Sequence, residues 1–158
     1  MKILVSSCLL GEKVRYDGQS KAVDRIEELS RYYELIPFCP EVSGGLSVPR
    51  EAAEIKGSAI DILENKSDSS VQTSSGTDVT AEFLTGAGIV LNICKEQGIT
   101  LAILKSKSPS CGTGTVYDGT FSRTLTEGFG VTAQLLRDND IEVMDESRIE
   151  ELLSSCEG

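Results

Sequence analysis

Three short apolar runs, each followed within a few residues by a cysteine, constrain the fold of this chain more than any other feature. The runs at residues 3–5, 34–36 and 101–104 precede Cys8, Cys39 and Cys111. Runs of this length and composition predict buried β-strands. In an open parallel sheet, ligand sites lie beyond the carboxyl ends of the strands. We therefore expect the three cysteines to converge at one edge of a sheet, in a metal or cluster site rather than a disulfide.

The rest of the chain alternates between strand and helix patterns. We predict strands at residues 2–7, 34–38, 100–104 and 141–144, and helices at residues 22–33, 78–98, 131–137 and 147–155. This alternation predicts an α/β fold: a three-layer sandwich with a mainly parallel sheet, of the Rossmann or flavodoxin-like kind, in one domain over residues 1–158. A small β excursion is expected at residues 51–72, and the serine-rich residues 67–76 are expected to form a polar loop.

Composition excludes several classes of function. The chain has 158 residues and a net charge of −10, which argues against nucleic acid and membrane as partners, because both select a basic surface. It has no histidine, which excludes Ser-His-Asp and Cys-His catalysis and histidine-ligated metals. A metal would therefore depend on cysteine, and thiolates favour zinc, copper(I) or iron–sulfur.

The location is expected to be cytoplasmic. No secretory signal precedes Cys8, and no apolar run approaches the ~20 residues of a membrane helix. Thiols stay reduced in the cytosol, where clustered cysteines indicate metal binding or catalysis rather than disulfides.

The five cysteines fall into two groups. Cys8, Cys39 and Cys111 follow strands, and the polar, glycine-rich tract around Cys111 predicts that its side chain is exposed on a loop. Cys94 lies on the apolar stripe of a predicted helix and is expected to be a core residue. Cys156 lies near the terminus and is expected to be a free thiol. Three separated cysteines leave two alternatives, a structural metal with a fourth, non-cysteine ligand or a centre with an open coordination position.

Polar residues near these cysteines are candidates for chemistry. Glu41, two residues after Cys39, is the best candidate for a general acid or base, since no histidine competes for this role. Ser110, Ser108 and Lys107 can donate hydrogen bonds to substrate oxygens. The candidates for substrate binding are Ser7, Asp17, Lys107 and Ser108.

Several longer motifs carry a resemblance to a known family. They are Ser-Cys-Leu-Leu-Gly at 7–11, Arg-Tyr-Asp-Gly at 15–18, Cys-Pro-Glu-Val at 39–42, Val-Pro-Arg-Glu at 48–51, Ser-Pro-Ser-Cys-Gly at 108–112 and Tyr-Asp-Gly-Thr-Phe at 117–121. In this order they resemble a family long catalogued as a domain of unknown function, whose characterised branch is a bacterial thiouracil desulfidase. The resemblance runs almost from end to end.

This resemblance implies a cofactor and a reaction. It implies a [4Fe-4S] cluster, which exposure to air can remove, on Cys8, Cys39 and Cys111, with the fourth iron free to bind the sulfur of a small thiolated substrate. Sulfur would leave as hydrogen sulfide without net redox change, with Glu41 as proton carrier and Ser110 as helper. The alternatives are an iron–sulfur or sulfide carrier without turnover of its own, and a structural zinc protein. The sequence does not define the oligomeric state.

Overall fold

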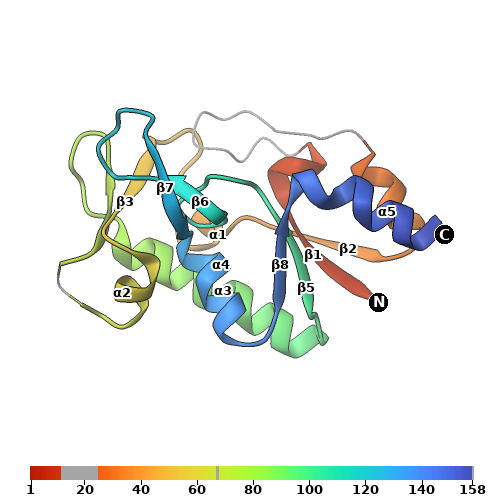
Figure 1. Cartoon of the computed structure of the whole chain (residues 1–158). Helices are drawn as coiled ribbons and strands as arrows, with labels where there is room; N and C mark the ends of the chain where they lie inside the picture. The colour runs from red at the N-terminus through yellow and green to blue at the C-terminus, as the bar shows by residue number, and fades with distance from the viewer. Residues whose placement is uncertain (12–24, 67, 158) are drawn as a thin grey trace.

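Four parallel strands form the central sheet in the computed structural model, which describes residues 1–11, 25–66 and 68–157. The strands are β1 (Lys2–Ser6), β2 (Glu34–Phe38), β5 (Leu101–Leu104) and β8 (Glu142–Asp145), in the order β2-β1-β5-β8 (Figure 1). All three neighbouring pairs are parallel. The prediction of a mainly parallel α/β sheet is confirmed, and its strands lie within a residue or two of the expected positions.

One face of the sheet packs against two helices, α3 (Thr80–Gln97) and α4 (Val131–Asp138), which run along the lower part of Figure 1. Leu4, Ala102 and Leu104 are fully buried and belong to the hydrophobic cluster on this side. These residues alternate along their strands with residues of the other face, as the period of two in a strand requires.

The opposite face packs against η2 (Ile26–Arg31), a short 3-10 helix, and α5 (Ile149–Glu157). Ile3, Val5 and Ile103 are fully buried in the cluster on this side. The sheet therefore lies between two helical layers, as predicted. Because both faces are covered, the two central strands, β1 and β5, contain continuous apolar runs rather than alternating ones.

The ends of α3 agree with the helix predicted at 78–98. The backbone N–H of Thr80 donates to Oδ1 of Asp78 at 2.9 Å, and Gly98 ends the helix in the left-handed conformation at φ 68°. The helix predicted at 22–33 differs, since its described part is the 3-10 helix η2, while residues 22–24 lie outside the described residues. The terminal helix is present and is preceded by η3 (Glu146–Arg148), a single 3-10 turn.

A small hairpin of β3 (Ala53–Lys56) and β4 (Ser70–Thr73), with α2 (Ala59–Leu63) between its strands, forms the β excursion predicted at 51–72. The prediction that residues 67–76 form a loop is wrong for Ser70–Thr73. Val71 in this strand is fully buried, and its backbone N–H donates to the hydroxyl of Thr80 at 2.9 Å, so the serine-rich tract is held in place as a strand.

A second antiparallel hairpin was not predicted from the sequence. It consists of β6 (Thr113–Tyr117) and β7 (Leu125–Phe129), which lie on the left of Figure 1 with β3. None of the helices in the described part of the chain has the length and apolar character that crossing a bilayer requires.

Candidate functional site

The three strand-end cysteines line a single cavity at the carboxyl edge of the sheet. Cys8 lies in η1 (Ser7–Leu10), a 3-10 turn directly after β1, while Cys39 directly follows β2 and Cys111 lies in the loop after β5. The cavity has a volume of about 80 Å³, and its polar lining residues are Ser6, Ser7, Glu41, Arg50, Lys105, Ser108 and Ser110. The parallel sheet thus brings together three thiols from distant parts of the sequence.

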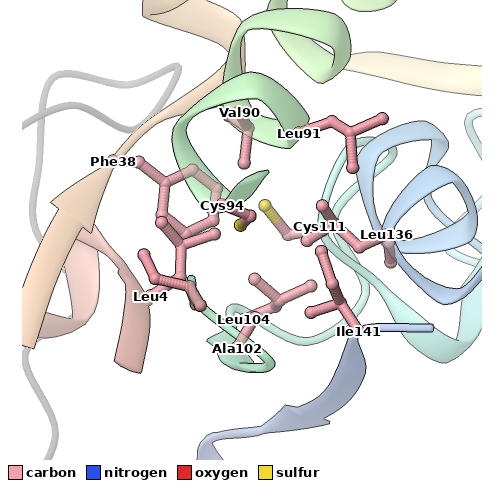
Figure 2. Packing of buried hydrophobic residues seen from close by; sticks show 12 residues of the cluster. Leu4, Phe38, Val90, Leu91, Cys94, Ala102, Leu104, Cys111, Leu136 and Ile141 are labelled. Atoms are coloured by element: carbon pink, nitrogen blue, oxygen red, sulfur yellow. The ribbon is translucent and has the colours of Figure 1, made fainter. Parts of the chain in front are cut away.

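Cys111 is buried, so the prediction that it is exposed on a loop is wrong. Its side chain is only 4% exposed and lies in the apolar cluster shown in Figure 2. The loop is fastened to the first turn of α4, where the N–H groups of Val131 and Ala133 donate to the carbonyls of Pro109 and Ser110 at 2.8 and 3.0 Å. The polar groups of this loop form hydrogen bonds with one another and with the first turn of α4, and the Cys111 side chain is directed inward.

Burial sets the protonation of two of the cavity thiols, those of Cys111 and Cys39. It raises the pKa of Cys111 to about 12, against the opposing effect of hydrogen bonds from the hydroxyls of Ser110 and Ser6. Burial also raises the pKa of Cys39, with a further contribution from the negative charge of Glu41. These thiols are therefore protonated at neutral pH in the protein alone, and a bound cation would have to displace their protons.

Glu41 is positioned by α1 (Pro40–Ser43), the short helix that directly follows Cys39. Its Oε1 lies 3.3 Å from Nε of Arg50, and its Oε2 accepts a hydrogen bond of 3.3 Å from the hydroxyl of Ser110. The Arg50 side chain is only 8% exposed and that of Glu41 17%, so the ion pair is largely shielded from water. Both carboxylate oxygens are thereby held in fixed directions.

The hydroxyls of Ser108 and Ser110 form a directed hydrogen-bond chain toward Glu41. The Oγ atom of Ser108 accepts the backbone N–H groups of Ser110 and Cys111, each at 3.1 Å. A hydroxyl has two acceptor lone pairs and one hydrogen, so Ser108 donates its hydrogen to Ser110 Oγ, 2.9 Å away. Ser110 is then free to donate to Glu41 at 3.3 Å, which completes a line of three hydrogen-bonded polar groups.

The placement of α1 depends on a close backbone contact with α3 at Gly44 and Gly86. A Cβ atom on Gly86 would lie 1.9 Å from the carbonyl oxygen of Pro40, and one on Gly44 would lie 2.0 Å from the carbonyl oxygen of Glu82. Only glycine permits this approach. The contact sets the height of α1 above the sheet, and with it the position of Glu41.

The structure brings two of the four predicted substrate-binding residues to the cavity. Ser7 and Ser108 line it. Lys107 does not line it and instead pairs with Val116 in an isolated β-bridge, and Asp17 lies outside the described residues.

Three residues that line the cavity were not predicted from the sequence as part of the site. Arg50 belongs to the Val-Pro-Arg-Glu motif, where its charge nine positions after Glu41 was the available signal. Lys105 follows β5 directly and pairs with Glu146 at 3.2 Å. Ser6, the last residue of β1, carried no recognisable signal.

The other two cysteines are not among the residues that line this cavity. Cys94 is 1% exposed in the core on α3, as predicted. Cys156 lies on α5, where its thiol is 3.3 Å from the hydroxyl of Tyr33. Within residues 1–11, 25–66 and 68–157, no three cysteine or carboxylate side chains are close enough together to hold a single metal ion.

Comparisons with known proteins identify a family and two similar proteins. The model of the 2-thiouracil desulfurase family matches residues 3–148. The protein YbbK of Bacillus subtilis (strain 168), described as uncharacterized, is 42% identical over 152 residues, which make up 96% of this chain and 99% of YbbK. The solved structure of the [4Fe-4S]-dependent thiouracil desulfidase TudS (DUF523Vcz) superposes with a TM-score of 0.86 at 44% identity, over 99% of this chain and 97% of TudS.

Proposed function

The chain belongs to the 2-thiouracil desulfurase family, and from this membership we propose that it is a [4Fe-4S]-dependent desulfidase. Its substrate would be a thiolated pyrimidine or a similar small thio-compound, from which it would remove sulfur as hydrogen sulfide. The similarity to TudS, at 44% identity over nearly the whole of both chains, supports this proposal. The observation that carries it is one cavity lined by three cysteines together with a shielded, hydrogen-bonded carboxylate.

The donor set of the cavity fits an iron–sulfur cluster. Cys8, Cys39 and Cys111 offer an all-sulfur set in a chain without histidine, and thiolates are the usual ligands of such clusters. A [4Fe-4S] cluster commonly has four cysteine ligands, so three would leave one iron without a protein sulfur. When bound, the cluster supplies a Lewis-acidic iron with an open position for the sulfur of the substrate.

The reaction needs water and proton transfer but no oxidant. The oxygen of water forms a bond to the thiocarbonyl carbon, the carbon–sulfur bond breaks, and sulfur leaves as hydrogen sulfide with the two protons of water. Glu41 would take a proton from the attacking water and return it to the departing sulfur. Ser110, whose hydroxyl donates to Glu41 at 3.3 Å, would steady the charged carboxylate and help to relay the proton.

Substrate orientation would depend on polar groups of the cavity wall. The hydroxyl of Ser7 can donate to the carbonyl oxygen of a thiolated pyrimidine, and both Ser7 and Ser108 line the cavity. Asp17 and Lys107 remain predictions as further contacts.

The test is the content of iron and acid-labile sulfide in protein prepared without oxygen, beside a Cys111→Ala variant. A brown protein with about four irons per chain, bleached by the substitution, and sulfide release from 2-thiouracil are expected. A carrier protein would hold the same iron and release no sulfide from 2-thiouracil. A colourless protein that cannot be reconstituted with iron and sulfide would overturn the proposal.

A further inference from the structure

We infer that the hydroxyl of Ser6 is a fixed hydrogen-bond donor to the sulfur of Cys111, and that it raises both the reduction potential and the retention of the cluster. This inference rests on the proposed function, because it requires a cluster on Cys111. It assigns a positioning role to a residue outside the proton-transfer chain.

The geometry around Ser6 directs its hydrogen to the sulfur. Ser6 is the last residue of β1 and is 3% exposed, and its Oγ lies 3.7 Å from Sγ of Cys111, a residue 105 positions away in the chain. The same Oγ accepts the backbone N–H of Lys105 at 3.0 Å. Because that N–H occupies a lone pair of the oxygen, the hydroxyl hydrogen is directed elsewhere. Within the described residues, the Cys111 sulfur is the acceptor that this hydrogen finds.

Ser110 is a poorer donor to the same sulfur. Its Oγ lies 3.6 Å from Sγ of Cys111, but also 3.3 Å from Oε2 of Glu41. Its one hydrogen must be divided between these two acceptors, and a carboxylate is the stronger of them. The hydrogen bond to sulfur therefore falls mainly to Ser6, which is anchored at the junction of β1 and β5.

The effect of the Ser6 hydroxyl on the cluster follows from the negative charge of a thiolate that binds iron. An O–H donor stabilises negative charge on the sulfur, and a buried site strengthens the effect. The reduced cluster carries one more negative charge than the oxidised one, so the donor stabilises the reduced form more and makes the reduction potential less negative. Outer-shell hydrogen bonds of this kind also hold first-shell ligands in place and increase metal affinity.

The experiment compares wild type and Ser6→Ala, both reconstituted without oxygen. The midpoint potential of the cluster is measured by a redox titration followed by electron paramagnetic resonance, and iron retention by competition with a chelator. We expect a more negative potential in Ser6→Ala and about a tenfold loss of iron affinity. The matched control is Ser69→Ala, because Ser69 is also buried and its hydroxyl also accepts a backbone N–H, that of Ser58 at 3.2 Å, in another part of the fold. The cluster of the Ser69→Ala variant should have the same reduction potential as that of wild type.

A second pair of variants separates the hydrogen bond from a role of Ser6 in folding. Ser6→Thr and Ser6→Val have nearly the same shape and suit a strand, but only threonine retains the donor. The potential should stay near that of wild type in Ser6→Thr and become more negative in Ser6→Val. Equal potentials in Ser6→Ala, Ser6→Val and wild type, with iron bound in all three, would overturn this inference and leave the proposed function intact. Failure of wild type itself to bind iron would overturn both.

Discussion

The guanidinium of Arg50 lies 3.3 Å from Oε1 of Glu41, with both side chains largely shielded at the wall of the cysteine-lined cavity. The other carboxylate oxygen accepts the hydroxyl of Ser110. Arg50 is itself anchored, because its Nη1 donates to the carbonyl of Ser47 at 2.9 Å. The carboxylate proposed to move the proton is therefore held by a cation on one side and a hydroxyl on the other.

Glu41→Gln should abolish turnover while leaving the cluster in place. An amide of the same shape cannot take a proton from water, and loss of a general acid–base group typically lowers kcat by about 100- to 10,000-fold. The measurement is the rate of sulfide release from 2-thiouracil at an iron content equal to that of wild type. Sulfide release at the wild-type rate would remove Glu41 from the mechanism.

Replacing Arg50 should reduce both stability and rate. Arg50→Met leaves the shielded Glu41 carboxylate without its cation, so we expect the free energy of unfolding to fall by about 3 kcal/mol, the lower end of the range for broken buried pairs. Arg50→Lys keeps the charge but not the planar donor group, and should lower kcat more than it changes KM.

A double-mutant cycle separates the Arg50 ion pair from packing. In the Arg50→Met/Glu41→Gln double variant the unpaired charge is gone, so part of the stability lost in Arg50→Met should return, as measured by urea unfolding. Strict additivity of the two single substitutions would show that the pair contributes no coupling energy.

Cys94 and Cys111 are both buried in the same apolar cluster. Replacing each of them therefore distinguishes a cysteine that binds the cluster from one that only packs in the core. Cys94→Ala should retain full iron content and lose only about 1 kcal/mol of stability, as expected for removal of one buried heavy atom. Cys111→Ala should lose the cluster. Iron and acid-labile sulfide content, measured beside thermal unfolding of both variants, distinguishes the two roles; equal iron loss in both would contradict the assignment.

The arrangement of the sheet and the gathering of the cysteines could be predicted because both depend on local sequence. Apolar runs before Cys8, Cys39 and Cys111 mark buried strands, and parallel pairing then brings their carboxyl ends to one edge. Burial of Cys111 could not be predicted in this way. The polar tract around it normally indicates an exposed loop. Here the hydroxyl of Ser110 donates to Glu41, the carbonyls of Pro109 and Ser110 accept N–H groups from the first turn of α4, and the buried sulfur accepts the hydroxyl of Ser6.

Two other features escaped prediction for a related physical reason. The hairpin of β6 and β7 contains Gly114 and Gly128 directly opposite each other, so its strands lack the alternating apolar pattern that would reveal them. Arg50 lies in a turn-rich tract with no periodicity, and its role comes from a contact with Glu41 that depends on the tertiary fold. Local sequence pattern identifies helices and strands, whereas a contact between polar groups separated in the sequence depends on the tertiary fold.

Asp78 should stabilise the start of α3 in a pH-dependent way. Hydrogen bonds from the hydroxyl and N–H of Thr80 lower the pKa of Asp78 in the folded protein. A lowered folded-state pKa contributes stability above the unfolded pKa of about 3.9, and this contribution is lost as the pH falls through the folded value. Asp78→Ala should thus destabilise the folded protein at pH 7, with a difference from wild type that shrinks below pH 4. Thermal unfolding over this pH range is the measurement, and a difference that grows on acidification would contradict the assignment.

Two glycines of α3 should respond in opposite ways to alanine. Gly88 has no other atom within 4 Å of where a Cβ would lie, so Gly88→Ala should stabilise the helix by about 0.5–1 kcal/mol. At Gly86 a Cβ would lie 1.9 Å from the carbonyl oxygen of Pro40. That oxygen belongs to the backbone of α1 and cannot rotate away, so Gly86→Ala must push α1 off α3 and should cost about 1–3 kcal/mol despite the better helix propensity of alanine.

The displacement of α1 caused by Gly86→Ala should also lower the rate of the proposed reaction, because α1 carries Glu41 and begins directly after Cys39. A shift of α1 lengthens the hydrogen bond between Glu41 and Ser110, and misplacement of a catalytic group by about 1 Å can lower a rate by about 100-fold. We expect Gly86→Ala to lose sulfide release and part of its iron, whereas Gly88→Ala, changed on the same helix, keeps both. Paired measurement of unfolding free energy, iron content and kcat in the two variants tests this. If Gly86→Ala loses stability but keeps the kcat of wild type, then α1 is not held in position by the contact with α3, and another part of the fold must fix Glu41.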